Sequence, residues 1–177
     1  MPEQKRIETE RLILRPFRED DAEAIFSGWA NDPEVTRYLT WNPHRSLEDT
    51  KAILSCWLSE ESPFRFGIER KEDGKLIGSI DVAKFEGSVP EIGYCLSRSA
   101  WGNGYMTEAC LAFRDYLLSL GYHEIILRAV KENRRSIRVF QKCGFVYEKT
   151  RENVPISPWK EGTHDLVCYR YKAPKNK

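Results

Sequence analysis

The stretch EIGYCLSRSAWGNGYMTEAC, residues 91–110, changes character twice along its length. It begins as a short apolar strand, continues as a polar loop that contains Gly102 and Gly104, and leads into a helix. Because glycine has no side chain, a ligand can approach such a loop closely, and the free N–H groups of a helix N-terminus attract anions. The stretch therefore predicts a cradle for a diphosphate, although a plain strand-to-helix turn also favours Gly and Asn.

Two common phosphate-binding motifs do not fit this loop. A dinucleotide fingerprint, G-x-G-x-x-G, requires glycine at position 107, where the chain has Thr107. A P-loop requires Gly-Lys-Ser/Thr, which does not occur in the sequence. We therefore do not expect a nucleotide-binding protein of either kind.

Hydrophobic periodicity on both sides of the loop predicts seven strands and four helices. We expect strands at residues 11–17, 63–70, 75–85, 90–97, 123–130, 145–151 and 163–171, and helices at 18–32, 46–62, 106–120 and 133–143. Ser46 is the expected N-cap of the second helix, and Asp73 and Gly74 mark a hairpin turn. This order predicts an α/β (mixed α+β) fold, a mixed sheet with helices on both faces.

Composition limits the class of protein. The 177 residues suffice for one domain, residues 1–177, and the net charge of +1 argues against nucleic-acid binding. The five cysteines form no C-x-x-C pair, so we expect neither a disulfide framework nor a zinc site, and a reducing cytoplasm is the favoured compartment. No stretch approaches the roughly 20 apolar residues that span a bilayer, and no signal-type apolar run begins the chain.

A second segment, AVKENRRSIRVFQKCGFVYEKTRE at residues 129–152, adds to the first. Together they resemble the GCN5-related N-acetyltransferase (GNAT) superfamily: WGNGYMTEA is similar to its coenzyme-A loop, and ENRRSIRVFQKCGF to its N-x-x-S helix that ends in Gly-Phe. The opening ETERLILRPFREDDAEAIF and the late GTHDLVCYRY are similar to the RimJ/RimL-like branch, which acetylates N-termini of ribosomal proteins. The resemblance extends from about Glu8 to Tyr171.

The resemblance implies a fold and an activity. The fold is a single GNAT domain with its core at about residues 8–172, built on a central, mixed, mostly antiparallel sheet of about seven strands flanked by about four helices. The activity is transfer of an acetyl group from acetyl-CoA to a primary amine without a metal, and the family also forms homodimers. The acceptor stays open between a protein N-terminus and a small-molecule amine such as a polyamine or an antibiotic. A non-catalytic CoA-binding or ribosome-associated module is the alternative.

The resemblance also implies contacts to the coenzyme. They are Tyr94, Cys95, Leu96 and Ser97 on the strand, Trp101, Gly102, Asn103, Gly104, Tyr105 and Met106 in the loop, and Asn133 and Ser136 on the later helix. The family loop often runs Gln/Arg-x-x-Gly-x-Gly/Ala, whereas this chain has Trp101 first and Met106 last. The cradle would therefore depend on backbone N–H groups. Arg98, Arg134 and Arg135 are candidate outer charges, although a solvated surface charge is the favoured interpretation of each, because surface arginine is the common case.

Catalytic and acceptor residues are expected near the same loop. By resemblance, Glu91 is the candidate general base, with Glu108 as the weaker choice, and the Ser136 hydroxyl can donate a hydrogen bond to the thiolate leaving group. Asn133 and Ser136 also fit a simple helix N-cap. An aromatic segment that includes Tyr38 and Trp41 is the candidate acceptor site, although Trp41 can equally pack on the core.

Overall fold

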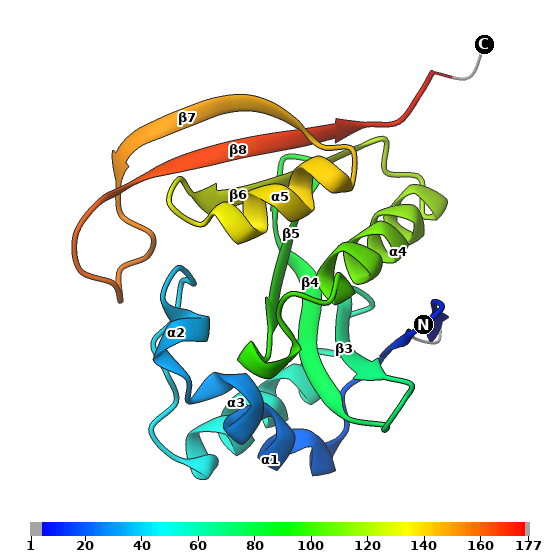
Figure 1. The fold of residues 1–177 in the computed structure, drawn as a ribbon, viewed down its shortest axis with the longest axis vertical. Helices are drawn as coiled ribbons and strands as arrows, with labels where there is room; N and C mark the ends of the chain where they lie inside the picture. The colour runs from blue at the N-terminus through cyan, green and yellow to red at the C-terminus, as the bar shows by residue number, and fades with distance from the viewer. Residues whose placement is uncertain (1–4, 176–177) are drawn as a thin grey trace.

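An eight-stranded sheet organises the chain in the computed structural model, which describes residues 5–175 (Figure 1). The strands are β1 (Ile7–Glu8), β2 (Leu12–Arg15), β3 (Arg65–Arg70), β4 (Leu76–Glu86), β5 (Val89–Leu96), β6 (Glu124–Val130), β7 (Val146–Val154) and β8 (His164–Lys172). Their spatial order is β1-β2-β3-β4-β5-β6-β8-β7. Every neighbouring pair is antiparallel except β5 and β6, which are parallel.

Five α-helices surround this sheet. They are α1 (Ala22–Ile25), α2 (Pro33–Thr36), α3 (Leu47–Glu60), α4 (Tyr105–Ser119) and α5 (Arg134–Lys142). Short 3-10 turns at Glu19–Asp21 and Arg98–Ala100 and a π-helical turn at Phe26–Ala30 complete the helical segments. The predicted mixed fold with a mostly antiparallel sheet is confirmed. The helix expected at residues 18–32 is instead a succession of 3-10, α and π turns.

Local capping signals in the sequence set the helix ends. The Ser46 hydroxyl accepts a hydrogen bond from the Asp49 N–H, and the Asp49 carboxylate accepts one from the Ser46 N–H, so the two residues form a capping box. After α4 and α5 the chain turns at Gly121 and Gly144, whose φ angles of +96° and +83° favour glycine. These signals confirm the ends that the sequence predicts.

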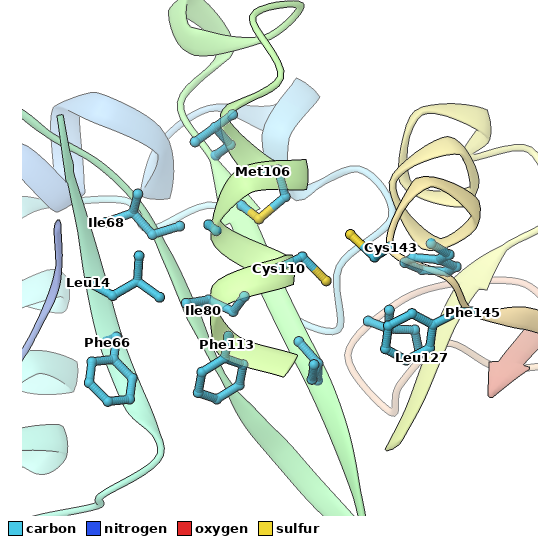
Figure 2. Close-up of a cluster of buried hydrophobic side chains, with 14 of the residues drawn as sticks. Leu14, Phe66, Ile68, Ile80, Met106, Cys110, Phe113, Leu127, Cys143 and Phe145 are labelled. Carbon is cyan, nitrogen blue, oxygen red and sulfur yellow. The ribbon is translucent and has the colours of Figure 1, made fainter. Parts of the chain in front are cut away.

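Helices cover both faces of the sheet, each over its own buried cluster. On one face, α4 packs against β2, β3, β4 and β5; Figure 2 shows Met106, Cys110 and Phe113 of this helix among side chains of the strands. On the other face, α1 and α3 cover a cluster that includes the fully buried Trp29. Burying each large apolar side chain stabilises the fold by about 1.5–3 kcal/mol, so both layers hold the middle of the sheet rigid.

The C-terminal hairpin brings a late segment of the chain near an early one. Strands β7 and β8 lie along one side of the molecule, and the loop that joins them approaches α2 (Figure 1). There the Asn42 amide donates to the Trp159 carbonyl oxygen at 3.0 Å, and the Lys160 ammonium donates to the Thr36 carbonyl oxygen at 2.9 Å. These bonds tie α2 and the segment that follows it to the β7–β8 loop.

Residues 5–175 contain neither a membrane-spanning helix nor a cluster of metal-ligating side chains. No helix within residues 5–175 has the length and apolarity to cross a bilayer. In the same range, no group of three or more His, Cys, Asp or Glu side chains is arranged to hold a metal ion.

Candidate active site

Strands β5 and β6 are neighbours in the sheet, but ladder pairing between them is confined to one place. In the described part of the sheet their register holds a single pair, Glu91 with Ile126. Towards the glycine loop the two strands diverge, whereas β5 stays paired with β4 from Val89 to Leu96. The sheet therefore has a slot between β5 and β6, and one edge of β5 faces it.

The ladder between β4 and β5 shows which main-chain groups face the slot. The Ser97 N–H donates to the Ile77 carbonyl oxygen at 2.7 Å. Hydrogen-bonding direction alternates along an antiparallel strand, so Cys95 also bonds towards β4, while Tyr94 and Leu96 present their N–H and C=O groups to the opposite side. The Leu96 carbonyl oxygen already accepts from the Trp101 indole N–H, so the strand edge offers the Tyr94 N–H and C=O and the Leu96 N–H to an extended amide chain.

The loop after β5 places two glycines at the N-terminus of α4. Gly102 and Gly104 both have φ of +78°, which glycine adopts without the strain that a side chain brings. Gly104 is the N-cap of α4, and no side chain caps the helix there. No hydrogen bond in the described chain uses the N–H of Gly102 or Gly104. The loop and the first turn of α4 thus present free donors at the positive end of a helix dipole.

These elements enclose a cavity of about 580 Å³. Its walls come from α2 and the segment that follows it, from β5, from the glycine loop and α4, and from α5. Basic residues outnumber acidic ones on this lining: Arg37, Arg134, Arg135, Arg138 and Lys142 against Glu34 and Glu132. The cavity therefore carries a positive potential that suits a ligand with several phosphates.

Trp101 links two walls of the cavity. Its indole N–H donates to the Leu96 carbonyl oxygen at 2.9 Å, which fixes the ring beside the end of β5. The Arg135 guanidinium lies 3.6 Å from the centre of this ring, in the geometry of a cation–π contact. Trp101 itself carries no charge, but it holds a charged group from α5 beside the glycine loop.

Ser136 lies in the first turn of α5 and lines the cavity together with Asn133. The Asn133 side-chain amide donates to the Ser136 hydroxyl oxygen at 3.2 Å, and the Asn133 side-chain oxygen accepts from the Ser136 N–H at 3.4 Å. Asn133 is therefore the N-cap of α5, as one of the two sequence interpretations has it. Because the Ser136 oxygen accepts this bond, its own O–H proton can donate to another partner.

Most of the residues expected to contact the coenzyme line the cavity together. The lining includes Tyr94, Cys95, Leu96, Trp101, Gly102, Gly104, Tyr105, Met106, Asn133 and Ser136, and also Tyr38 from the expected acceptor segment. The candidate charges Arg134 and Arg135 are on the lining as well. The strand, the glycine loop and the N-x-x-S helix therefore meet in one place, as the sequence predicts.

Glu91 and Glu108, the two carboxylates considered as bases, are not on this lining. The Glu91 carboxylate is 11% exposed and pairs with Arg128 at 3.0 Å and Lys84 at 3.5 Å. Glu108 pairs with Arg11 at 2.9 Å. Neither carboxylate is on the lining, and each is held in an ion pair with a cation, so we do not assign the role of general base to either of them.

Four other expectations also need correction. Ser97 does not line the cavity, because its N–H bonds to Ile77 and its hydroxyl to the Gly28 carbonyl. Asn103 braces the loop from within, and Trp41 packs on the cluster under α1 and α3, so neither is on the lining. Arg98 forms an ion pair with Asp32 and is equally absent from it.

Sequence reasoning missed two parts of the lining. One is α2, and its signal was present: the Asp32 carboxylate caps the helix by accepting from the Glu34 N–H, and Pro33 stands at the first helical position. The other is the face of α5 that carries Arg138, Val139 and Lys142. These residues follow Arg135 at intervals of three and four, which places them on one side of the helix.

Comparison with known sequences agrees with this geometry. A family model described as an acetyltransferase (GNAT) domain matches residues 11–146. The uncharacterized N-acetyltransferase YoaA of Bacillus subtilis is 35% identical to this chain, over 80% of this chain and 83% of its own length. The putative ribosomal N-acetyltransferase YdaF of the same organism is 27% identical, over 90% of each chain.

Solved structures share the fold. An acetyltransferase of the GNAT family from Bacillus anthracis superposes with a TM-score of 0.85 at 26% identity, over 95% of this chain and 98% of that chain. RimL, a ribosomal L7/L12 α-N-protein acetyltransferase solved with coenzyme A, superposes with a TM-score of 0.82 over 96% and 98% of the two chains. At 19% identity the second likeness concerns the fold alone.

Proposed function

As a member of the GNAT family of acetyltransferases, this chain is an acetyl-CoA-dependent N-acetyltransferase, and we propose that its acceptor is the α-amine of a peptide or protein N-terminus. The observation that carries the proposal is which carboxylates lie on the cavity lining. Within the described chain, only Glu34 and Glu132 bring carboxylates to the cavity lining, and Glu91 is held in ion pairs outside it. We assign no general base among these carboxylates, so an acceptor that is already partly deprotonated near neutral pH fits the site best.

An α-amine meets this requirement better than an alkylamine. Its pKa is about 7.7–8.0, whereas that of a lysine-type amine is about 10.4, so near neutral pH a far larger fraction is already the free base. YdaF, whose name assigns it a ribosomal acceptor, supports the same class.

The residues of this chain fit acetyl-CoA. The free N–H groups of Gly102 and Gly104 and the start of α4 suit the diphosphate, and Arg135 and its basic neighbours suit the remaining phosphate charge. The edge of β5 at Tyr94 and Leu96 suits the amides of the pantetheine arm.

The thioester supplies an activated acetyl group and a thiolate leaving group. On the protein side, we assign Ser136 to the leaving group, because Asn133 orients its hydroxyl and leaves the proton free to donate. The N-terminus of α5 adds a dipole that favours negative charge at the same place. Cys143 is fully buried and does not line the cavity, so we assign no acyl-enzyme step to it. Transfer is then a direct attack by the amine in a ternary complex.

A matched set of acceptors tests this proposal. A lysine-free peptide with a free N-terminus, the same peptide N-terminally blocked with one lysine added, and spermidine are each incubated with acetyl-CoA, and thiol release is measured from pH 6.5 to 9. We expect turnover with the free N-terminus and little with the other two. Faster turnover with spermidine or with the blocked peptide would overturn the α-amine assignment.

Two further results would change the account in other ways. Acetyl-CoA binding without thiol release for any amine would mean a CoA-binding module with no turnover. Turnover of a small aromatic or sugar amine in preference to all peptides would assign the site to small molecules.

A further inference from the structure

Arg11 reaches the glycine loop from outside the cavity. It precedes β2, and its guanidinium donates to the Asn103 carbonyl oxygen at 2.9 Å and to the Glu108 carboxylate at 2.9 Å. Its main-chain N–H donates to the other oxygen of Glu108 at 3.0 Å, and the guanidinium lies 4.4 Å from the centre of the Tyr105 ring. Four contacts from one residue therefore fix the loop and the first turn of α4, although Arg11 does not line the cavity.

The bond from Arg11 to Asn103 fixes the direction of a neighbouring donor. The Asn103 carbonyl and the Gly104 N–H belong to one peptide unit, and in the described chain every peptide unit is trans. In a planar trans unit the C=O and N–H bonds point in opposite directions. Because the Asn103 carbonyl points out to Arg11, the Gly104 N–H points away from Arg11. Gly104 is on the cavity lining and Asn103 is not, so this direction is towards the cavity.

The Asn103 side chain does the same for the preceding glycine. Its amide donates to the carbonyl oxygens of Ala100 and Trp101, each at 3.1 Å. The Trp101 carbonyl shares a peptide unit with the Gly102 N–H, so holding that carbonyl inside the loop turns this N–H the other way. Asn103 and Arg11 together form what we call the brace of the loop. The Asn103 side chain orients the Gly102 N–H, and the Asn103 carbonyl, held by Arg11, orients the Gly104 N–H.

Arg11 also neutralises a charge that would repel a diphosphate. Glu108 lies in the first turn of α4, close to the loop. Burial alone would raise the pKa of its carboxyl, but the hydrogen bonds from Thr9 and Arg11 outweigh burial and hold the pKa below its usual value. Glu108 is therefore ionised at neutral pH, and without the Arg11 guanidinium it would be an anion beside the cradle that keeps the hydrogen bond from Thr9 but loses its ion pair.

From these contacts we propose that Arg11 and Asn103 are positioning residues, which aim the N–H groups of Gly102 and Gly104 at the diphosphate of acetyl-CoA without touching it. The inference rests on the proposed coenzyme site. It predicts that their loss weakens recognition of the phosphates and of no other part of the donor.

Two donors test the inference, one with and one without the 3′-phosphoadenosine diphosphate part of coenzyme A. Acetyl-CoA carries the diphosphate, whereas S-acetylpantetheine has the same thioester and amide arm without any phosphate. For Arg11→Ala we expect the KM for acetyl-CoA to rise about ten- to a hundredfold, the value of one or two charge-assisted hydrogen bonds, with little change in kcat. The KM for S-acetylpantetheine should stay within about twofold of wild type.

Control variants separate positioning from charge and from folding. Arg6→Ala removes a cation from the same segment but only an exposed pair with Glu8, and it should leave both donors unchanged. The double variant Arg11→Ala, Glu108→Gln also removes the negative charge of Glu108. Its KM for acetyl-CoA should therefore lie between those of wild type and Arg11→Ala. Asn103→Ala removes the side chain that holds the Ala100 and Trp101 carbonyls, and because Asn103 is exposed, the variant should fold. If Arg11→Ala melts below the assay temperature, the KM values of Asn103→Ala for the two donors test the positioning role instead.

Each outcome has a distinct meaning. If folded Arg11→Ala and Asn103→Ala lose both donors equally, or lose neither, the positioning role is wrong and the cradle itself stands. If wild type uses S-acetylpantetheine as well as acetyl-CoA, the diphosphate cradle is wrong, and the proposed coenzyme site fails with it. A selective loss for acetyl-CoA in both variants supports the inference.

Discussion

Replacing Ser136 by alanine tests the assignment of the leaving-group donor. The change removes one hydroxyl from the first turn of α5 and leaves the N-cap bond between the Ser136 N–H and the Asn133 side-chain oxygen in place. It takes away one partner of the Asn133 amide, at 3.2 Å. Because the lining of the cavity is otherwise unchanged, the variant isolates the hydroxyl.

The two expected effects differ in size. A hydrogen bond to a charged group contributes about 1.5–3 kcal/mol, so kcat should fall about ten- to a hundredfold if the hydroxyl stabilises the thiolate. Loss of the neutral bond from Asn133 costs about 1 kcal/mol of folding stability, which for a chain of this size lowers Tm by about 2–4 °C. The KM for acetyl-CoA should change little, since the phosphates bind elsewhere.

Steady-state kinetics at saturating acceptor, together with thermal melts, give all three quantities. Ser119→Ala is the matched control, because that hydroxyl donates to the Tyr116 carbonyl oxygen at the far end of α4. Ser136→Thr, which keeps a hydroxyl, should retain more activity than Ser136→Ala. An alanine variant that folds and turns over at the wild-type kcat would refute the leaving-group role.

Three further changes probe the cradle and the sheet. Gly104→Ala and Gly74→Ala each place a side chain on a residue with a left-handed backbone, φ +78° and +68°, and each should lower the free energy of unfolding by about 1–2 kcal/mol. Only Gly104→Ala should weaken acetyl-CoA binding in calorimetry. Equal binding of acetyl-CoA by the two variants would contradict the cradle. Arg135→Ala should weaken acetyl-CoA binding about tenfold and make it less sensitive to salt, whereas a binding curve identical to wild type at low and high salt would remove this arginine from the site. Burial raises the pKa of Asp81 to about 6, so ionisation of this carboxyl lowers the free energy of unfolding as the pH rises from about 4 to above 6. Asp81→Asn should therefore raise Tm more at pH 8 than at pH 4. Equal Tm shifts at both pH values would show that ionisation of Asp81 does not lower the stability.

Several helix ends can be predicted from short local patterns in the sequence. The capping box at Ser46 and Asp49 and the glycines that end α4 and α5 act within one turn of the chain, so they can be predicted without tertiary contacts. Two elements were missed for physical reasons. Strand β1 has two residues, too few for an alternating pattern, and α2 has four, too few for helical periodicity.

In the candidate site, too, the parts set by contiguous motifs were predictable, and the parts set by long-range contacts were not. The glycine loop and the N-x-x-S helix are contiguous motifs, and the structure brings both to one cavity, as the sequence predicts. Glu91 is different, because its role depends on Arg128, a residue of β6 far along the chain that holds the carboxylate outside the cavity. The brace from Arg11 to Asn103 likewise joins distant segments, and no local pattern could reveal it.

A crystal structure of the protein with coenzyme A tests the central claim most directly. The account predicts diphosphate oxygens within about 2.7–3.2 Å of the main-chain nitrogens of Gly102, Gly104 and the first residues of α4. It also predicts the pantetheine arm along β5 at Tyr94 and Leu96, in the slot beside β6. Coenzyme A bound outside this slot, or a glycine loop whose N–H groups bond only to the protein itself, would contradict it.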